Sequence, residues 1–345
     1  MTWELEFGSW ELIPINAWRD GWKRVIAAPA IVAGVFAMTI LLALPLAITM
    51  RGVLADHLGD SLASESAATG VNYDWWQEFT AQATGLGTTF SPSIIGFATV
   101  LDNISGLLDA RARIAPIAAA LGLYLAGWTF LSGGILDRYA RQRPIRAQGF
   151  FAASGVYFFR FVRLAMIAGL IYWWLFGYVH PWLFDEQFVN LTRGMNVERS
   201  AFLIRAFFYV IFGTLLVGAN LIVDYAKVRI VVEDRHSALG ALSAAIRFIR
   251  NHFRHVIALF ALNSLTFLAL LAAWAIVAPG VGNAGLSMWI AFLVAQMYVI
   301  ARLLLKLQFI ASQTALFQAK LAHSSYTSAP VPAWPDSPAA EAIHS

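Results

Sequence analysis

Residues 224–258 read DYAKVRIVVEDRHSALGALSAAIRFIRNHFRHVIA and lie between two long apolar runs. The stretch nevertheless carries six basic residues: Lys227, Arg229, Arg235, Arg247, Arg250 and Arg254. In its second half, large apolar residues recur at spacings of three and four, which predicts an amphipathic helix with one apolar stripe. That stripe comprises Leu239, Leu242, Ile246, Ile249 and Phe253.

Three arginines of this helix, Arg247, Arg250 and Arg254, follow the same rhythm and form a second stripe about 100° round the helix. An apolar stripe beside an arginine stripe is typical of a helix on the cytoplasmic face of a bilayer. There, lipid phosphates contact the charges and acyl chains contact the apolar side chains. The alternative is that the apolar stripe packs on other helices of the same protein, and the two interpretations are compatible.

The composition indicates an integral membrane protein. Hydrophobic residues make up 59% of the chain and charged residues 13%, and the mean hydropathy is +0.65. Soluble domains average about half and about a quarter, respectively. The chain has no cysteine, which excludes disulfides, thiolate catalysis and zinc–sulfur sites. The net charge of +4 is small, so the placement of the basic residues is more informative than their sum.

Six apolar runs are long enough to cross a bilayer as helices of about 20 residues. They cover residues 25–50, 115–136, 164–184, 201–223, 256–278 and 289–307. Trp18 and Trp22 lie one helical turn apart beside basic residues, which predicts an interfacial anchor before the first run. The expected fold is therefore all-α, a polytopic membrane protein of six transmembrane helices with interfacial amphipathic helices.

The chain divides into three parts. Residues 1–24 are expected to be a cytoplasmic interfacial segment, because they lack the basic start and apolar run of a secretory signal peptide. Residues 25–323 form the six-span membrane domain. Residues 324–345 are rich in Pro, Ser and Ala and are expected to be a disordered cytoplasmic tail.

The longest segment between spans, 51–114, is expected to be an extracytoplasmic loop that contains an amphipathic helix. Ser91 and Pro92 form a helix-start pattern, with serine as the cap and proline in the first turn. The apolar positions that follow are Ile94, Phe97, Leu101, Ile104 and Leu108. We expect this helix to lie on the outer surface or against the bundle.

Lysine and arginine predict the orientation. One side carries three in residues 1–24, four in 137–146, six in 224–254 and three from Arg302 onward, which makes 16. The other side carries three in residues 51–114 and two in 185–200, which makes five. Because positive residues are retained on the cytoplasmic side, both termini are expected in the cytoplasm of a bacterial inner-membrane protein.

Two segments of the chain resemble each other. The second span ends Ile-Leu-Asp-Arg-Tyr-Ala-Arg at 135–141, and the fourth ends Ile-Val-Asp-Tyr-Ala-Lys at 222–227. Each is followed by an arginine-bearing apolar stretch and a new span, and the first span begins in a similar way at Lys23. The pattern predicts a three-fold parallel repeat of helical hairpins, each preceded by an interfacial helix. The alternative is that basic and small residues recur at any cytoplasmic boundary.

The exit of the fourth span carries a resemblance to known proteins, through Val231-Val-Glu-Asp, Ala238-Leu, Ala241-Leu and Ala244-Ala-Ile. This pattern resembles the six-span membrane domain attached to some bacterial glycerophosphodiester phosphodiesterases and the YciC-like families, in which a similar helix precedes the fifth span. The resemblance covers about a fifth of the chain. It implies a six-helix membrane fold. The phosphodiesterase activity is not carried over to this chain, because no segment of the sequence could form the catalytic barrel.

Ionisable residues near the spans are the first candidates for function. Four are expected to close the inner end of the bundle: Asp137, Asp224, Arg302 and Lys306. The two aspartates would pair with these two bases or with neighbouring arginines, and the alternative is an ion pathway. Seven bases at the inner boundary are expected to contact lipid headgroups: Arg247, Arg250, Arg254, Arg160, Arg163, Lys23 and Arg24. Asn220, Asn263 and Gln296 would either line a polar pathway or bond between helices.

Catalytic and metal chemistry have little support in the sequence. His252 and His255 are three apart but lie among arginines, which repel a cation, and nothing arranges His57, Asp102 and Asp109 as an acid–base set. We expect no catalytic residue, metal, cofactor or nucleic acid. The predicted protein is a non-catalytic, membrane-organising or accessory subunit that binds anionic lipid headgroups and a protein partner or a second copy. The alternative is a transporter or lipid-handling permease.

Overall fold

The computed structural model describes residues 13–59, 61–69, 72–90, 97–280 and 285–325, and within them it contains helices and no strand. Six helical segments are long and apolar enough to cross a membrane. Five of them are single helices: α3 Pro29–Leu58, α7 Ala115–Arg141, α10 Glu198–Val232, α12 Phe253–Val277 and α13 Leu286–Ser325. The sixth is α8 Ala147–Trp174, which continues through the π-helical turns η3 Leu175–Val179 and η4 Trp182–Gln187 into α9 Phe188–Thr192. The expected all-α, six-span architecture is confirmed.

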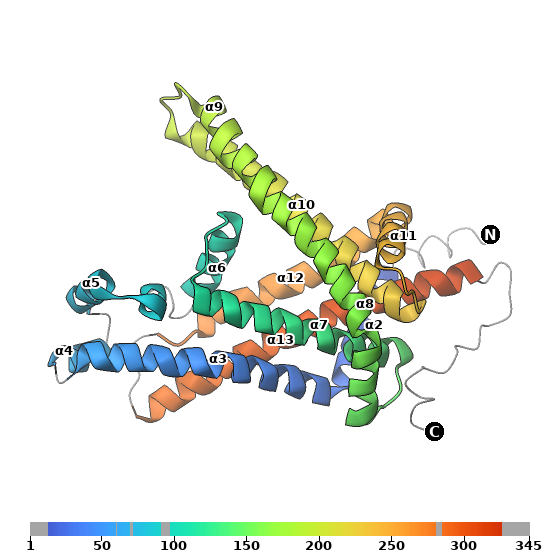
Figure 1. The fold of residues 1–345 in the computed structure, drawn as a ribbon, viewed down its shortest axis with the longest axis horizontal. Coiled ribbons are helices and arrows are strands. Elements are labelled where there is room, and N and C mark those ends of the chain that lie inside the picture. Colours follow the sequence, from blue (N-terminus) through green and yellow to red (C-terminus); the bar gives the residue numbers. More distant parts are fainter. Residues whose placement is uncertain (1–12, 60, 70–71, 91–96, 281–284, 326–345) are drawn as a thin grey trace.

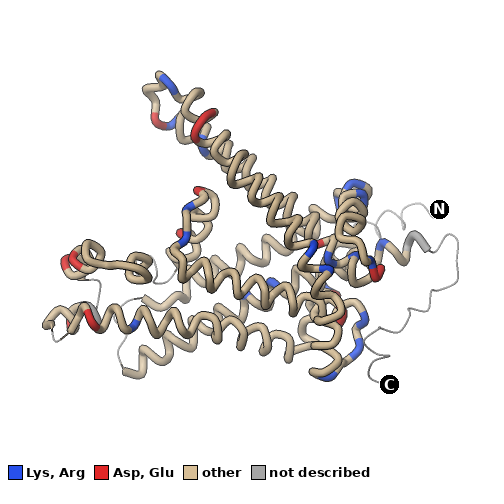
Figure 2. Tube along the Cα trace, viewed as in Figure 1, with Lys and Arg blue, Asp and Glu red and all other residues tan. Residues whose placement is uncertain are grey.

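The remaining elements are short. They are α2 Ile13–Ile26, α4 Ala63–Thr69, α5 Tyr73–Gln82, the 3-10 helix η1 Gly85–Thr89, α6 Ala98–Leu108 and α11 Ala238–Asn251. Figure 1 shows α2, α11 and the C-terminal part of α13 at one end of the molecule, which we call the base, with α4 and α5 at the opposite, distal end. Charged residues gather at these two ends, at the tip of the hairpin that α8 and α10 form, and around α6, while the lengths of the spanning helices between them carry few charges (Figure 2). This distribution is typical of a membrane-spanning bundle.

The base holds the largest apolar core. Its buried residues come from α2, α7, α8, α10, α11, α12 and α13. Small residues allow close approach there: a Cβ on Gly134 of α7 would lie 2.7 Å from the carbonyl oxygen of Phe150 on α8. A Cβ on Gly21 of α2 would lie 2.9 Å from Cα of Ser312 on α13. Glycine at such contacts is a common feature of helix packing in membranes.

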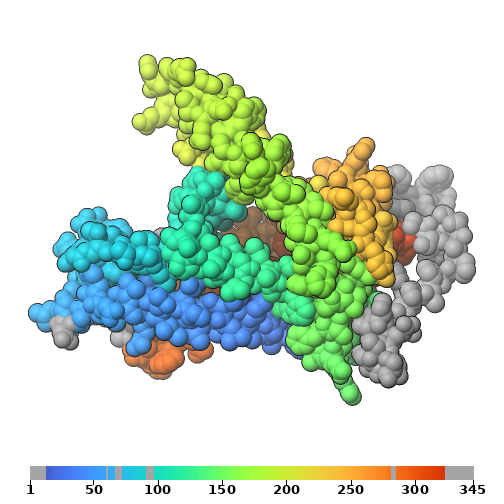
Figure 3. All heavy atoms as spheres, in the orientation of Figure 1, coloured from blue at the N-terminus to red at the C-terminus, as the bar shows by residue number. Residues whose placement is uncertain are grey.

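The helices separate toward the distal end. The α8–α10 hairpin leans away from α3, α7, α12 and α13 (Figure 1). Its distal half has an apolar core of its own around Phe208 and Phe212, and α12 and α13 have another around Trp274 and Tyr298. Helix α6 stands between the two, since Leu108 packs on the first core and Val100 belongs to the second. Figure 3 shows a recess between the α8–α10 hairpin and helices α6 and α7.

Helix α6 differs in part from the predicted amphipathic helix in the 51–114 loop. Phe97 and Leu108 pack on the apolar cores, whereas Leu101 and Ile104 are exposed. Val100 is buried in their place. Ser91, Pro92 and Ile94 lie outside the described residues, as does most of the predicted tail, 326–345.

The three predicted repeat units are not alike in structure. In the first and third, a short helix breaks from the following span, α2 from α3 near Ala28 and α11 from α12 at His252. In the second, no break separates the arginine-bearing stretch from the span, because α8 runs without interruption from Ala147 to Trp174. The parallel repeat remains a prediction from the sequence.

Candidate functional site

The outward face of α11 is the first candidate site. Ser237 caps the helix, its Oγ accepting a hydrogen bond from the Gly240 backbone nitrogen at 3.1 Å. The face that packs on the base is made of small residues and one phenylalanine: Ala238, Ala241, Ala244, Ala245 and Phe248. The predicted apolar stripe is therefore not the buried face of this helix.

Three members of the apolar stripe point away from the protein. Leu239 is 67% exposed, Ile246 39% and Phe253 58%. Leu242 and Ile249 lie at the edge of the buried face and pack partly on the base core. The alternative that the whole stripe packs on neighbouring helices is thus wrong for the three exposed members.

The arginine stripe is exposed on the same outward side. Arg247 and Arg250 on α11 are solvent-accessible, and so is Arg254. The predicted helix breaks at His252, so Phe253 and Arg254 lie in the first turn of α12 and not on α11. Arg229, by contrast, faces the protein: its Nη2 lies 3.3 Å from Oε1 of Glu233, and its guanidinium lies over the ring of Phe317. The basic residues of 224–258 thus divide into an inward and an outward group. The outward group adjoins exposed apolar side chains.

Arg24 on α2 is turned into the protein. Its Nη1 donates to the Tyr139 carbonyl oxygen at 2.9 Å and to Oε1 of Gln318 at 2.7 Å, and its Nη2 lies 2.6 Å from Oδ2 of Asp20. Burial lowers the pKa of this guanidinium, although Asp20 acts in the opposite direction. The neighbouring Lys23 is exposed. Arg24 therefore joins α2, α7 and α13, which replaces the lipid contact expected for it.

Arg160 is also used inside the protein. Its Nη1 forms an ion pair with the carboxylate of Asp234, which links α8 to the connection between α10 and α11. Arg163, one turn further along α8, is exposed. Five of the seven bases expected at the lipid interface are thus accessible: Arg247, Arg250, Arg254, Arg163 and Lys23.

The two inner-end aspartates each pair with a base on their own helix. Asp137 accepts from Nε of Arg141 at 2.7 Å, and Asp224 accepts from Nζ of Lys227 at 3.1 Å. Asp224 also accepts from the amide of Asn220 at 3.1 Å. Such bonds between residues three or four apart lie along one helix surface and do not tie different helices together.

Lys306 and Arg302, the expected cross-helix bases, lie against aromatic rings. Nζ of Lys306 donates to the Tyr124 hydroxyl at 3.0 Å and lies 3.6 Å from the ring centroid of Trp128, both on α7. The Arg302 guanidinium lies 5.8 Å from the ring centroid of Tyr298. These are cation–π contacts. The inner-end ion pairs therefore form within α7 and α10, and the two bases of α13 contact ring faces.

The amides proposed for a polar pathway lie in different surroundings. Asn263 is 1% exposed, and its amide donates to Oγ of Ser312 at 2.9 Å between α12 and α13. Asn220 is exposed on α10, and Gln296 is half-buried on α13. Asn263 and Asn220 thus do not line one path.

The histidines have different neighbours in the structure. His252 packs on the Phe248 ring, and Nε2 of His255 lies 3.3 Å from Nζ of Lys320. Burial lowers the pKa of His252, and the charges of Lys320 and His255 act in the same direction. His57 accepts at Nδ1 from the indole nitrogen of Trp75 at 3.1 Å, beside an open depression of about 860 Å³. In the described part of the chain, no group of three potential metal ligands lies close together.

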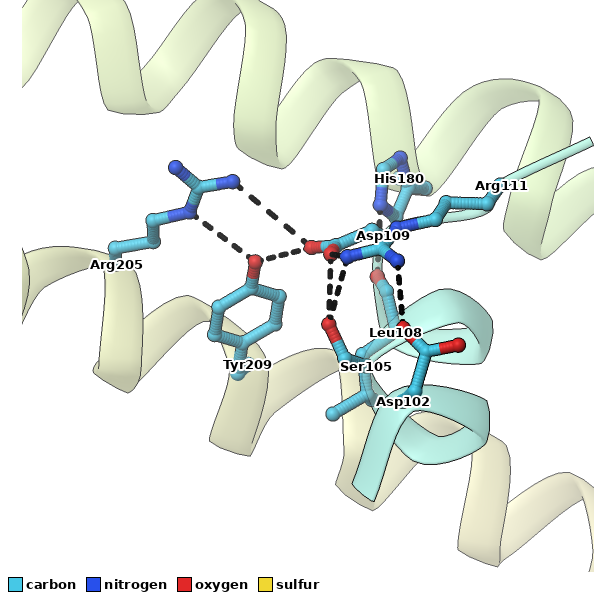
Figure 4. A network of polar contacts seen from close by, with 8 residues as sticks. All are labelled: Asp102, Ser105, Leu108, Asp109, Arg111, His180, Arg205 and Tyr209. Carbon is cyan, nitrogen blue, oxygen red and sulfur yellow. Dashed lines mark hydrogen bonds and ion pairs between the residues drawn. The ribbon is translucent and has the colours of Figure 1, made fainter. Parts of the chain in front are cut away.

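A distal network that the sequence did not reveal connects α6 to the α8–α10 hairpin (Figure 4). At its centre, Asp109 accepts from the Tyr209 hydroxyl, from Oγ of Ser105 at 3.1 Å and from Nη2 of Arg111 at 3.2 Å. Arg205 donates from Nε to the Tyr209 hydroxyl at 3.1 Å.

The hydrogen bond from Tyr209, more than any other contact, lowers the pKa of Asp109. Nearby, Nε2 of His180 donates to the Leu108 carbonyl oxygen at 3.0 Å. These bonds fix the distance between the hairpin and the α6–α7 corner. Spacing in the sequence could not indicate them, because Asp109 and Tyr209 are 100 residues apart.

Comparison with known proteins gives no further assignment: no family model matches the chain, and neither a curated protein nor a solved structure is significantly similar to it.

Proposed function

We propose that the protein is a non-catalytic accessory or membrane-organising subunit that engages anionic lipid headgroups at its base. The outward face of α11 carries this proposal. Leu239 and Ile246 are exposed there beside Arg247 and Arg250, and Phe253 and Arg254 are exposed in the first turn of α12, while a different, alanine-rich face of α11 packs on the bundle. An exposed apolar surface that is not needed for folding marks a contact with lipid or with a partner.

Magnitudes favour contact with the lipid surface. Each of Arg247, Arg250 and Arg254 would contribute about 1 kcal/mol near an anionic leaflet, so the three together contribute roughly 3 kcal/mol, which salt weakens. Each large apolar side chain would add about 1.5–3 kcal/mol if fully buried, and less at an interface. The apolar and the charged side chains therefore both contribute to the free energy of membrane binding, and neither contribution requires a protein partner.

The lipid preference of the full-length protein tests this proposal. Spin-labelled lipids in nanodiscs report the fraction of each lipid that the protein immobilises, and we expect a preference for anionic over zwitterionic headgroups. Arg247→Gln with Arg250→Gln should reduce that preference, whereas Arg247→Lys with Arg250→Lys should retain it, because the charge is kept. An unchanged preference in the glutamine variant would contradict the proposal.

The orientation and location belong to the same proposal. Six spans return the chain to the side on which it began, and α2 packs directly on α13. With 16 bases predicted on that side, we place the base in the cytoplasm and the protein in a bacterial inner membrane. The likeness to phosphodiesterase membrane domains and YciC-like families supports this placement. A protein partner or a second copy would bind at the base.

A lipid-handling permease is the second candidate. The recess between the α8–α10 hairpin and helices α6 and α7 favours it, because the recess is open to the side of the bundle (Figure 3). A substrate path would have to follow this recess, since Asn263 is enclosed between α12 and α13. Transport of a fluorescent phospholipid between leaflets of proteoliposomes tests this candidate directly.

A further inference from the structure

Two bases of α13 carry charge within the spanning region, and no described carboxylate forms a direct ion pair with them. Lys306 and Arg302 lie one helical turn apart. Within the described ranges of the chain, no Asp or Glu oxygen lies within ion-pair distance of either base, and their polar and ring contacts are with Tyr124, Trp128 and Tyr298. Ionisable side chains inside a membrane usually pair with one another or mark a functional site.

The neighbouring ionised groups are already paired. Asp224 on α10 is held by Lys227 and Asn220, and Asp137 on α7 is held by Arg141. A ring face attracts a cation less strongly than a carboxylate does, so the contacts with Tyr124 and Trp128 offset only part of the desolvation of Lys306. The charge of Asp224 reaches Lys306 only from beyond ion-pair distance, so neither base of α13 is neutralised by a direct carboxylate contact.

The position of these bases suggests how an anion could reach them. Lys306 contacts α7, and α10 contacts both α7 and α13 toward the base. Beyond this junction the α8–α10 hairpin leaves the other helices, and the recess of Figure 3 opens between it and α6 and α7. The outer surfaces of these helices are apolar, with exposed side chains such as Leu121 and Leu125 on α7 and Phe207 and Val210 on α10.

We propose that Lys306 and Arg302 bind the phosphate of a phospholipid whose acyl chains lie in this recess. Arg302 would present the planar fork that matches a phosphate, and Lys306 would act as a point charge. The Tyr124 hydroxyl accepts from Lys306 and retains its own proton to donate to a phosphate oxygen. This site is separate from the α11 face and does not depend on it.

The site is tested by a double substitution that removes both charges and changes the shape of the side chains little. Arg302→Met with Lys306→Met keeps the length and apolar stems of both side chains, and it removes charges that have no carboxylate partner, so the variant is expected to fold. Arg302→Lys with Lys306→Arg is the matched control that keeps both charges. Arg247→Gln with Arg250→Gln separates this site from the α11 face.

The measurements are native mass spectrometry and thermal unfolding of the detergent-purified full-length protein with phosphatidylglycerol, with diacylglycerol or with inorganic phosphate. We expect phosphatidylglycerol alone to be retained and to raise the unfolding temperature of the natural protein, the charge-keeping control and the α11 variant. The methionine variant should retain it at least about tenfold less.

Each contrary result has a definite meaning. Equal retention by the methionine variant would refute the site. Stabilisation by inorganic phosphate equal to that by phosphatidylglycerol would refute the lipid as its source and indicate a free anion. Retention of diacylglycerol as strong as that of phosphatidylglycerol would show that the recess binds acyl chains without the two bases. Loss of retention in the α11 variant would place the lipid on the other surface.

Discussion

Arg24 donates a hydrogen bond to the backbone carbonyl oxygen of Tyr139 at 2.9 Å, joining α2 to the last turn of α7 across 115 residues of sequence. The same guanidinium binds Asp20 and Gln318, and Gln318 donates in turn to the Ala140 carbonyl oxygen at 2.9 Å. A short helix ahead of the first span is thus fixed to the end of the second and sixth spanning helices. This contact makes α2 part of the base.

Loss of the Arg24 side chain should therefore destabilise the bundle. Arg24→Gln leaves the Tyr139 carbonyl and Gln318 without their charged donor, and hydrogen bonds to charged groups are worth about 1.5–3 kcal/mol. Thermal unfolding in detergent should shift downward by several degrees. Lys23→Gln, at the exposed neighbouring position, is the control and should leave the transition in place. Equal unfolding temperatures for the two variants would show that the Arg24 contacts contribute little.

The packing of α2 on α13 gives a second prediction, at Gly21. A Cβ there would lie 2.7 Å from Oε1 of Gln308 and 2.9 Å from Cα of Ser312, so Gly21→Ala must displace backbone. Overpacking of this kind costs about 1–3 kcal/mol.

Gly34→Ala on α3 is the matched control, since a Cβ at Gly34 meets no atom within 4 Å. That change should be neutral or stabilise by up to about 1 kcal/mol through helix propensity. A Gly21 variant as stable as the Gly34 variant, in the same unfolding assay, would mean that α2 and α13 are further apart than described.

The sequence predicted the spans because their composition alone determines them: about 20 apolar residues in a row have few alternatives to a transmembrane helix. It also predicted α11, since its leucines and isoleucines follow a helical period, but it missed the break at His252 that places Phe253 and Arg254 in α12. It did not predict which face of α11 is buried. Ala241 and Ala245 pack on the bundle because small side chains let helices approach closely, whereas periodicity gives more weight to large residues such as Leu239 and Ile246.

The polar contacts were harder to predict. Arg24 looks like a surface base in the sequence, and its burial depends on Gln318, which lies almost 300 residues away. The uninterrupted course of α8 from Ala147 to Trp174 was also not indicated by the local sequence, which resembles the stretches that break at Ala28 and His252. Lys306 over the ring of Trp128 is a contact between two spans, and no local pattern indicates it.

The distal network should respond to acid. The Tyr209 hydroxyl lowers the pKa of Asp109, so the stabilisation from this carboxylate is fully present above the ordinary Asp value of about 3.9. It is lost as the pH falls through the lowered value of the folded state. Tyr209→Phe removes the main cause of the shift. The network of this variant should open at a higher pH than that of the natural protein.

The distance between spin labels at Asn103→Cys on α6 and Asn190→Cys on α9, measured as the pH is lowered, would report the opening. Both positions are exposed, and the chain has no cysteine of its own. Tyr178→Phe is the control, since Tyr178 is an exposed tyrosine of the same hairpin. If the network opens at the same pH in Tyr209→Phe as in the natural protein, the Tyr209 hydroxyl does not determine the pKa of Asp109.

The proposed orientation can be tested by labelling in intact cells. Ser64→Cys on α4 and Ser243→Cys on α11 are exposed positions at opposite ends of the molecule. A membrane-impermeant thiol reagent should modify Ser64→Cys in intact cells and Ser243→Cys only after the cells are opened. Modification of Ser243→Cys in intact cells would reverse the orientation.

The depth of α11 in the membrane tests the central claim most directly. Nitroxides placed singly at Ile246→Cys and Arg247→Cys, about 100° apart on the helix, would be compared in nanodiscs by their accessibility to oxygen and to a water-soluble nickel complex. We predict that the label at position 246 lies among acyl chains, with high oxygen and low nickel accessibility, and that the label at 247 lies at the headgroups. High nickel accessibility at both positions would place α11 in water and contradict the account.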